Sequence, residues 1–389
     1  MNKLEKTIKS NSFIQKMYRV FFSLLFKFLS IFYPIKQNLI LISSFSGKKY
    51  NDSPKTIYDA ILKKFGPKHF RIVWAFEDPK LFEKYKLETV KINSFKYFRI
   101  AFSAKYWITN VNIERGLSFK KKGQIYLNTW HGSGPKTVGN AVSGRKDYDF
   151  SKVDYLCSDG DYLKNIFVKD FNANPEHVLL CGRPREDILY HPDATKIIET
   201  RLKYNINEND FVVLYAPTWR ETKKQQDNFA FETFLDIKKI FNVFPNCKIL
   251  YRAHSLASDN DAKSLFSNRF ISATEEQEIS SLFLISNVLI TDYSSANVDF
   301  SILNKPFICY APDYDTYIKS RSLYYDLVEE YPFGVQRTTD EVIEILKEIV
   351  CGNNKIDKFV KFKMKYGPFG GDATRVCLQK LFDELPKQE

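Results

Sequence analysis

The stretch LITDYSSANVDFSILNKP, residues 289–306, decides the expected fold. Its apolar start predicts a short buried strand that ends at Thr291 and Asp292, and Ser294 and Ser295 then open a short helix. A strand that leads directly into a helix is the unit from which parallel α/β sheets are built. Hydroxyl groups and backbone N–H groups at the start of such a helix favour a phosphate, although an ordinary capped helix has the same pattern.

The same alternation of strand and helix runs along the rest of the chain. Strand-like runs lie at 38–43, 70–75, 106–110 and 124–128 in the first half, and at 211–216, 248–253, 288–291 and 307–310 in the second. Helical stretches separate them, and the first begins at Ser53 and Pro54, a favourable N-cap and N1 pair. The pattern predicts an α/β protein with two doubly wound, Rossmann-like domains, joined near His191, that face a cleft.

The length of the chain agrees with two domains, because 389 residues exceed one ordinary core. We predict an N-terminal segment at 1–35, a first Rossmann-like domain at 36–190 and a second at 191–389. In open α/β sheets, ligands bind beyond the carboxyl ends of the strands. Candidate site residues are therefore sought directly after the strands.

The N-terminal segment is rich in apolar and aromatic residues, but charges interrupt it. Residues 12–34 read SFIQKMYRVFFSLLFKFLSIFYP, with Lys16, Arg19 and Lys27 inside the run. A membrane span needs about 20 mostly apolar residues, and no small-residue cleavage site follows. The composition predicts an amphipathic helix that lies in a membrane interface; the alternative is a helix packed on the body of the protein.

Charge and cysteine content narrow the functional classes. The net charge of +12 indicates an anionic partner, either nucleic acid, anionic lipid or a phosphate-rich substrate. Nucleic acid is not expected, because the chain has no basic-aromatic or zinc-finger signature. The six cysteines form no CxxC pair, so we interpret them as buried free thiols and expect no metal site.

A histidine follows one of the predicted strands in NTWHGSGPKTVG, residues 128–139. His131 stands between a strand end and a glycine-rich turn, and histidine is the side chain best suited to proton transfer near neutral pH. Small neighbours such as Gly132 allow a substrate to approach closely. A loop histidine that serves only the turn is the alternative.

Basic residues follow two strands of the second half. Arg220 in LYAPTWRE lies just beyond a strand end, where its guanidinium fits phosphate oxygens or forms a structural salt bridge. Arg252 and His254 in ILYRAHS are two residues apart and so face the same side, which suits a pyrophosphate. Asp299 lies one helical turn beyond the serines of the first-quoted stretch, where we expect it to accept a hydrogen bond from a ribose hydroxyl.

Two common nucleotide signatures do not occur. The chain has no GxGxxG after a strand, which disfavours nicotinamide or flavin binding, and no GxxxxGK[ST], which excludes a P-loop enzyme.

Taken together, these motifs resemble the CDP-glycerol:glycerophosphate glycerophosphotransferases of teichoic acid synthesis. The matching stretches are TWHG at 129–132, GRPREDIL at 182–189, YAPTWR at 215–220, RAH at 252–254, LISNVLITDYSSANVDF at 284–300 and KPFICYAPDYDTY at 305–317. The resemblance covers roughly residues 40–380. It departs at SGPK, residues 133–136, where the family often has TPLK, and at GGDATR, residues 370–375, in place of a DGxAS-like stretch. The first departure leaves the acceptor open.

The resemblance implies a GT-B-like fold, an acceptor domain at 36–190 and a CDP-alcohol donor domain at 191–389. By position, His131 corresponds to the catalytic histidine of the WHG motif, His254 and Arg220 to donor pyrophosphate contacts, and the two serines to phosphate-binding hydroxyls. The full predicted site assigns catalysis to His131 and His254, and substrate binding to Gly132, Lys136, Arg220, Arg252, Thr291, Asp292, Ser294, Ser295 and Asp299.

The implied reaction transfers glycerol phosphate from CDP-glycerol to a hydroxyl of a lipid-linked teichoic acid or related cell-surface polymer precursor, and releases CMP. No metal or other cofactor is expected, because cationic side chains can hold the phosphate charge. The expected partners are CDP-glycerol, a lipid-linked saccharide or glycerol-phosphate acceptor, and an anionic membrane surface at the cytoplasmic face of the bacterial cell membrane. A homo-oligomer is left open.

Three alternatives remain at this stage. The first is a CDP-ribitol-dependent or capsule polyol-phosphate transferase, the second a glycosyltransferase that uses UDP-sugars, and the third a non-catalytic, membrane-bound, polyanion-binding protein. The third gives no reason for His131, Arg220 and His254 all to follow strand ends.

Overall fold

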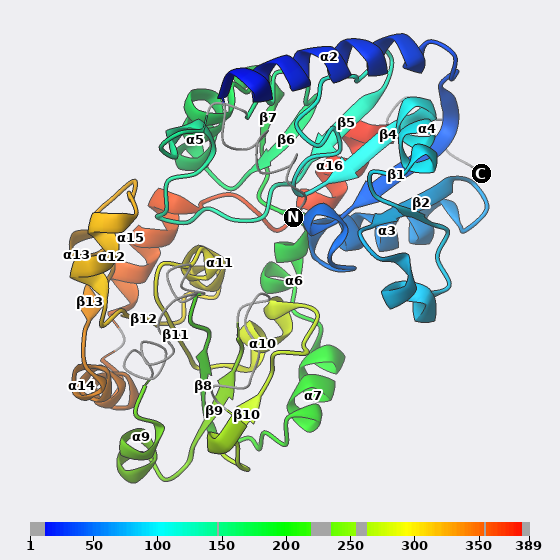
Figure 1. Ribbon diagram of the computed structural model, residues 1–389. Coiled ribbons are helices and arrows are strands. Elements are labelled where there is room, and N and C mark those ends of the chain that lie inside the picture. Colours follow the sequence, from blue (N-terminus) through cyan, green and yellow to red (C-terminus); the bar gives the residue numbers. More distant parts are fainter. Residues whose placement is uncertain (1–11, 146–147, 219–234, 254–262, 354, 383–389) are drawn as a thin grey trace.

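The computed structural model describes residues 12–145, 148–218, 235–253, 263–353 and 355–382. Two parallel sheets, each flanked by helices, form two lobes (Figure 1). The predicted α/β class is therefore confirmed. Arg220 and His254 lie outside the described residues.

The first sheet has seven parallel strands in the order β3-β2-β1-β4-β5-β6-β7. Its strands are β1 Lys36–Ser43, β2 Arg71–Phe76, β3 Thr89–Lys91, β4 Ala104–Thr109, β5 Ile125–Asn128, β6 Tyr155–Ser158 and β7 Val178–Leu180. The helices of this part are α2 Ser12–Ser30, α3 Asp52–Phe65, α4 Phe95–Ser103, α5 Asp161–Phe171 and α6 Asp187–Tyr190. The strand order reverses between β1 and β4, and this switch point is where open α/β sheets bind ligands.

The second sheet has six parallel strands in the order β10-β9-β8-β11-β12-β13, with its switch point between β8 and β11. Its strands are β8 Phe211–Tyr215, β9 Cys247–Tyr251, β10 Phe270–Ser272, β11 Val288–Thr291, β12 Phe307–Tyr310 and β13 Val335–Gln336. The remaining helices are α7 Ala194–Lys203, α9 Ile237–Val243, α10 Ile279–Ile285, α11 Ala296–Ser301, α12 Tyr314–Ser320, α13 Leu327–Glu330, α14 Thr339–Val350, α15 Ile356–Tyr366 and α16 Ala373–Phe382.

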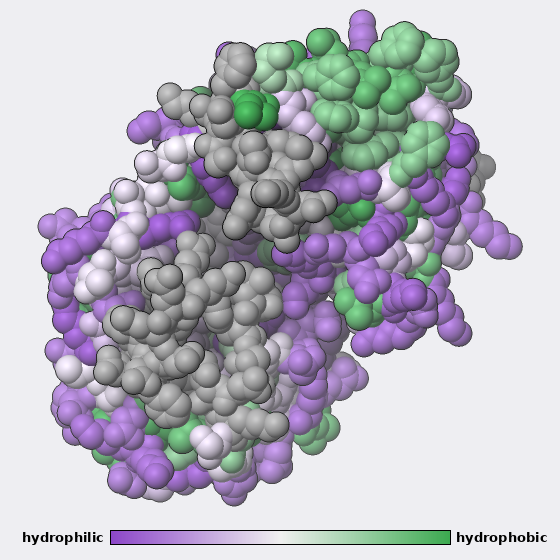
Figure 2. Space-filling view, in the orientation of Figure 1, coloured by the Kyte–Doolittle hydropathy of each residue, from purple (hydrophilic) through white to green (hydrophobic). Residues whose placement is uncertain are grey.

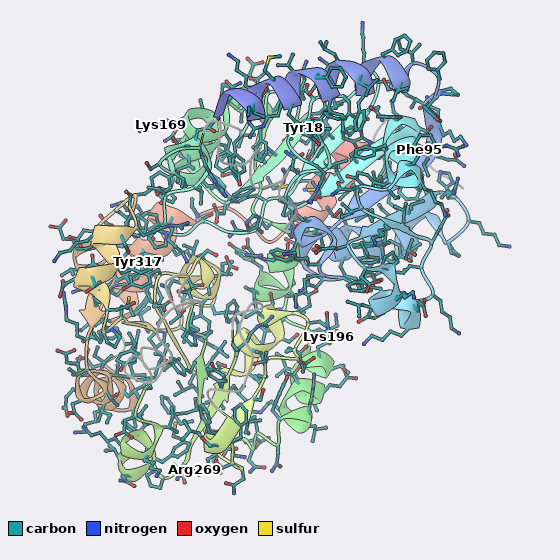
Figure 3. The ribbon with its side chains drawn as sticks, viewed as in Figure 1. Tyr18, Phe95, Lys169, Lys196, Arg269 and Tyr317 are labelled. Atoms are coloured by element: carbon teal, nitrogen blue, oxygen red, sulfur yellow. The ribbon has the colours of Figure 1, made fainter. Side chains whose placement is uncertain are left out.

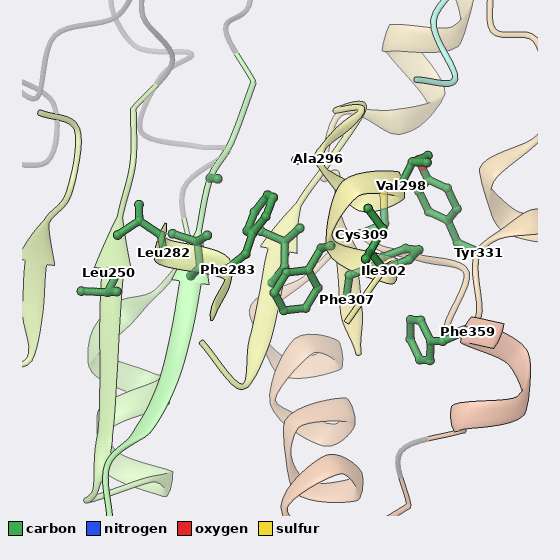
Figure 4. Close-up of a cluster of buried hydrophobic side chains, with 14 of the residues drawn as sticks. Leu250, Leu282, Phe283, Ala296, Val298, Ile302, Phe307, Cys309, Tyr331 and Phe359 are labelled. Carbon is green, nitrogen blue, oxygen red and sulfur yellow. The ribbon is translucent and has the colours of Figure 1, made fainter. Parts of the chain in front are cut away.

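An apolar core fixes the start of α11 relative to the second sheet. Figure 4 shows Phe283 of α10, Val298 of α11 and Phe359 of α15 packed with Phe307 of β12. All four side chains are at most 2% exposed. Burying a side chain of this size contributes about 1.5–3 kcal/mol. Tight packing beneath the loop between β11 and α11 therefore fixes the position of this loop.

The N-cap of helix α3 lies two residues before Ser53, the N-cap that the sequence predicts. Asn51 occupies the N-cap position, and Asp52 adopts a left-handed φ of 66°. Asp52 Oδ1 accepts a hydrogen bond from the Ser53 N–H at 2.7 Å, whereas the Asn51 side chain makes no cap hydrogen bond. This geometry turns the Asp52 side chain towards the first switch point.

The last helix departs from the predicted division of the chain at residue 191. Helix α16 packs on the first sheet, where Cys377, Leu381 and Phe382 are at most 3% exposed and belong to the same core as Trp74. The chain thus crosses to the second lobe and returns (Figure 1). The apolar face of α16 covers the first sheet beside α3, and this burial explains why the chain returns to the first lobe.

Helix α2 lies along the outside of the first lobe. Phe26 packs on Phe98 of α4, with the ring centroids 4.5 Å apart, and Ser23 Oγ accepts a hydrogen bond from the Ser118 N–H at 3.0 Å. The helix is therefore attached along one face. Among the described residues, no helix combines the length and apolar content needed to cross a bilayer.

Candidate active site at the junction of the two sheets

His131 is held in place by the loop that follows β5. Trp130 takes a left-handed φ of 52°, which reverses the chain, and its N–H donates to Asn128 Oδ1 at 2.9 Å. Its indole Nε1 donates to the Gly132 carbonyl at 2.9 Å, and the indole ring is 5% exposed. A non-glycine residue in this conformation costs about 1–3 kcal/mol, which the surrounding packing must offset. The strain directs His131 towards the switch point of the first sheet.

One ring nitrogen of His131 is fixed by the backbone. His131 Nδ1 lies 2.7 Å from the Asn110 carbonyl oxygen, just beyond β4. A carbonyl oxygen only accepts, so Nδ1 carries the proton and Nε2 of the neutral ring carries the lone pair. Burial lowers the pKa of His131, and although the Asn110 carbonyl and the Asp52 carboxylate oppose this effect, the pKa stays below its ordinary value. The ring is therefore a neutral proton acceptor at physiological pH.

Arg185 links the histidine loop to both lobes. Its Nη1 donates to Asp52 Oδ2 at 2.5 Å and to the His131 carbonyl at 3.1 Å, and its Nη2 donates to Asp299 Oδ2 at 2.6 Å. Asp52 belongs to α3 of the first lobe and Asp299 to α11 of the second. A planar guanidinium that bridges two carboxylates fixes direction as well as distance. Arg185 therefore sets the position of the histidine loop relative to α11.

A second arginine, Arg183, lies fully buried beside the first. Its Nη2 is 2.8 Å from Asp159 Oδ2 and 2.9 Å from Asp299 Oδ1, and its Nε donates to Glu186 Oε1 at 2.6 Å. Its Nη1 donates to Ser133 Oγ at 2.9 Å, in the histidine loop. A buried charge is tolerated only when it is paired and hydrogen-bonded, and Arg183 meets both conditions. These residues, together with Arg185 and Asp52, form what we call the junction network.

The glycine loop after His131 touches the serine loop of the second lobe. A Cβ atom on Gly132 would collide with the Ser295 hydroxyl, and one on Gly134 would lie 3.3 Å from the Ser295 N–H. Lys136 forms an antiparallel bridge with Leu323, and the Pro135 carbonyl accepts the Tyr324 N–H at 2.7 Å. Two predicted substrate-binding regions, from opposite lobes, thus meet at one place.

The other predicted residues of the β11–α11 loop have different surroundings. Thr291 donates to the Ala216 carbonyl at 2.6 Å, and the Asp292 carboxylate accepts from the Thr218 N–H at 3.1 Å, so both brace the loop after β8. Ser294 Oγ accepts from the Ala296 N–H at 3.1 Å. Both oxygens of Asp299 accept hydrogen bonds from Arg183 and Arg185, partners that the sequence did not predict. Burial would raise the pKa of Asp299, but the two arginines outweigh it and hold the pKa below its ordinary value.

Arg252 stands directly after β9, next to the contact between the lobes. Its Nη1 is buried and has no hydrogen-bond partner among the residues that the structure describes. Burial lowers its pKa, and the carboxylates of Glu278 and Glu276 act in the opposite direction. Glu278 in turn accepts from the Asp52 N–H at 3.0 Å, so this corner too connects the two lobes.

Sequence reasoning missed most of the junction network. Asp52, Asn110, Asp159, Arg183 and Arg185 were not assigned to the site. The available signal was the stretch GRPREDIL, residues 182–189, whose two arginines directly follow a short strand. That strand, β7, has three residues and was not predicted.

These features define a class of protein. Two parallel α/β sheets meet at their switch points, and a histidine with one fixed nitrogen stands between them beside buried arginines. This is an α/β enzyme with its site between two lobes.

Comparison with known proteins supplies the family. A family model described as CDP-Glycerol:Poly(glycerophosphate) glycerophosphotransferase matches residues 25–378. The chain belongs to this family of transferases, as its motifs predict. It is 33% identical over 317 residues to a teichoic acid poly(glycerol phosphate) polymerase of Staphylococcus epidermidis, covering 77% of this chain and 44% of that protein. It is 30% identical to a teichoic acid glycerol-phosphate transferase of Staphylococcus aureus, covering 89% of this chain and 93% of that protein.

A solved structure has the same fold along the whole chain. The wall teichoic acid polymerase TagF superposes with a TM-score of 0.79 at 27% identity, covering 99% of this chain and 100% of that one. A UDP-GlcNAc 2-epimerase of Neisseria meningitidis shares the fold alone, at 12% identity and a TM-score of 0.55.

Proposed function

We propose that this chain is a GT-B-like enzyme that transfers glycerol phosphate from CDP-glycerol to a hydroxyl group of a lipid-linked teichoic acid or related precursor. The family match supports the donor and the polymer class. The observation that carries the mechanism is the 2.7 Å contact between His131 Nδ1 and the Asn110 carbonyl. It leaves Nε2 as the proton acceptor at the point where the two lobes meet.

In the proposed reaction, the acceptor hydroxyl oxygen attacks the β-phosphorus of CDP-glycerol. The new P–O bond forms as the bond from that phosphorus to the bridging oxygen breaks, and CMP leaves with the electron pair. His131 Nε2 takes the hydroxyl proton. A general base placed in this way contributes about 10² to 10⁴ in rate.

The donor is proposed to bind against the second lobe. The buried Nη1 of Arg252 offers a hydrogen bond to an anionic oxygen, and Ser294 and Ser295 stand beside the histidine loop. Arg220 and His254 are proposed as further pyrophosphate contacts, on the strength of their motifs. Preorganised donors aimed at the developing charge stabilise the transition state without a divalent ion at the phosphates.

The donor specificity is tested by separate incubations with CDP-glycerol, CDP-ribitol and UDP-sugars. Each reaction contains a lipid-linked disaccharide or its glycerol-phosphate-primed form, and release of CMP or UDP is followed. We expect CMP from CDP-glycerol, with its release slowed by about 10² to 10⁴ in the His131→Ala variant. If CMP is released from CDP-ribitol alone, the reaction type stands, but the enzyme builds a ribitol-phosphate polymer. No release from any donor would support the non-catalytic alternative. If activity is lost on chelation and restored by Mg²⁺, the proposal that the transfer needs no divalent ion is wrong.

We further propose that α2 holds the enzyme on an anionic membrane surface. Phe21, Leu24 and Phe28 are 61%, 61% and 58% exposed, and Figure 2 shows this apolar surface gathered over α2. Figure 3 labels Tyr18 of α2 and Phe95 of α4 in the same part of the first lobe, and Phe95 is 70% exposed. Lys16 and Lys27 lie on the same exposed helix. Apolar and basic side chains together are typical of a helix in a membrane interface.

Point substitutions test this membrane contact better than deletion of the segment, because Phe26 and Leu29 pack on the core of the first lobe. The double variant Phe21→Glu/Leu24→Glu should fail to sediment with vesicles that contain anionic lipid, while the wild type sediments. Leu202→Glu is the control, since Leu202 is 75% exposed on α7 of the other lobe. Equal sedimentation of the α2 variant and the wild type would refute the proposal.

A further inference from the structure

Three cysteines from distant parts of the sequence converge inside the first lobe. Cys157 is in β6, Cys181 follows β7 and Cys377 is in α16. Their Sγ atoms all lie within 4.8 Å of one another, and those of Cys157 and Cys377 are 3.4 Å apart. All three are free thiols. The other three cysteines do not share this cluster: Cys247 and Cys309 lie in separate cores of the second lobe, and Cys351 is exposed.

The spacing of the sulfur atoms fits one soft cation. A Zn²⁺ ion bonds thiolate sulfur at about 2.3 Å, so three sulfurs in one plane around it stand about 4 Å apart. The sulfur atoms of the cluster are already near this separation. Thiolate ligands select Zn²⁺, Cu⁺ and similar cations over Mg²⁺ and Ca²⁺.

The surroundings allow a cation to enter without opening the core. Cys157 and Cys377 are fully buried, whereas Cys181 is partly exposed and provides the approach from solvent. Binding converts three thiols to thiolates and releases their three protons to solvent, so a divalent cation leaves one net negative charge. No oxidant or reductant is needed.

We propose that Cys157, Cys181 and Cys377 form a binding site for a thiophilic d¹⁰ cation, with Zn²⁺ as the physiological class of ligand. The site is separate from the phosphate chemistry and does not depend on the proposed reaction. It joins three segments that meet only in the folded chain: strand β6, the residues directly after β7, and the returning helix α16.

The cation site is connected to the junction network through two short segments of backbone. Cys157 stands two residues before Asp159, and Cys181 stands two residues before Arg183. Asp159 and Arg183 form the 2.8 Å buried ion pair described above. A cation on the two cysteines therefore fixes the backbone segments that carry this pair.

The test is a titration of the reduced, untagged full-length protein with Cd²⁺, followed by thiolate-to-metal charge-transfer absorption. We expect saturation at about one Cd²⁺ per chain, and displacement of bound Zn²⁺ measured with a chromogenic chelator. Cys181→Ser, the least buried change, should weaken Cd²⁺ binding by at least about tenfold, as loss of one of three ligands requires. Cys247→Ser and Cys351→Ser are the matched buried and exposed controls, and both should bind as the wild type does.

Any of three results would overturn the proposal. One is the absence of a saturable thiolate band in the wild type, which needs no variant to fold. Another is an alkylation and mass-spectrometry result that shows a Cys157–Cys377 disulfide in protein kept under reducing conditions. Unchanged Cd²⁺ binding in both Cys181→Ser and Cys377→Ser would place the ion elsewhere and would also refute it.

Discussion

The carboxyl edges of the two sheets differ in how their polar groups are paired. At the first edge, the Asn110 carbonyl accepts a hydrogen bond from His131 Nδ1. The side-chain Nδ2 of Asn110 donates to Asp52 Oδ1 at 3.1 Å. At the second edge, Arg252 keeps a buried Nη1 without a partner among the described residues. The pairing around His131 holds a reactive group still, although Arg185 Nε and Asn51 Oδ1 nearby have no hydrogen-bond partner among the described residues. At the second edge, the unused hydrogen bond of a buried guanidinium favours an anion that has yet to bind. The difference indicates that the first lobe supplies the proton acceptor and the second supplies the donor contacts.

The most severe way to break this division of roles is to remove the proton acceptor. His131→Ala should lower kcat by about 10² to 10⁴ and leave the fold intact. The measurement is CMP release under saturating donor. His177→Ala is a matched control, because His177 Nδ1 donates to the Val153 carbonyl at 2.8 Å in the same way, away from the junction. A wild-type rate in His131→Ala would show that another group accepts the proton.

The paired character of the first edge depends on Arg183. Arg183→Met leaves Asp159, Glu186 and Asp299 buried with one fewer cation, which should destabilise the fold by about 3–5 kcal/mol. Urea unfolding measures this loss. Arg71→Met is the control, since Arg71 and Glu88 form an exposed pair, 47% and 40% accessible, worth at most about 1 kcal/mol. Equal losses in the two variants would mean that the junction network adds no stability of its own.

The hydrogen bond that Arg252 leaves unused at the second edge is tested by substitution of this residue. Arg252→Met should raise KM for CDP-glycerol by roughly 10- to 100-fold, because a hydrogen bond to a charged group is worth about 1.5–3 kcal/mol. Steady-state kinetics with varied donor give this value. Arg337→Met removes an exposed arginine of the same lobe and should leave KM unchanged. If the KM for CDP-glycerol is unchanged in Arg252→Met, Arg252 does not bind the donor.

The contact between the two edges should depend on pH through Glu278. Burial, and then the nearby Asp52 carboxylate, raise the pKa of Glu278 from 4.5 to about 7. The folded protein therefore keeps this proton while the unfolded chain loses it near pH 4.5. The contribution of Glu278 to stability therefore falls as pH rises from 4.5 to about 7, and Glu278→Gln should remove this loss, up to about 3 kcal/mol.

The measurement is the free energy of unfolding in urea of the wild type and Glu278→Gln at about pH 5 and about pH 8. The variant should gain on the wild type at the higher pH. A difference between the two proteins that does not change with pH would show that Glu278 titrates normally.

Strong local patterns predicted the fold well. All eight predicted strands occur, because each is a continuous apolar run buried on both faces of a parallel sheet. Four of the five strands that were missed have only two or three residues, too few for a pattern. His131, Gly132 and Ser295 were recognised from motifs at strand ends, and the structure brings them together.

The junction network could not be predicted, because its contacts join residues far apart in the sequence. Arg183 and Asp299 are 116 positions apart, and Arg185 and Asp52 are 133 apart. Each residue taken alone is an ordinary charged residue in a loop or a helix. The two arginine partners of Asp299 were missed for the same reason, since nothing near it in the sequence indicates them, and its hydrogen bond to a ribose hydroxyl stays a prediction. The cysteine cluster was equally invisible to a search for local spacing.

The return of α16 to the first lobe has a mechanical consequence. Two segments cross between the lobes, and they are fastened side by side: Asp187 accepts from the Ala373 and Thr374 N–H groups at 3.0 and 2.8 Å, and His191 Nε2 donates to the Gly371 carbonyl at 2.9 Å. Any relative movement of the lobes must therefore bend both segments together, at the stretch GGDATR, residues 370–375, and at the chain next to it.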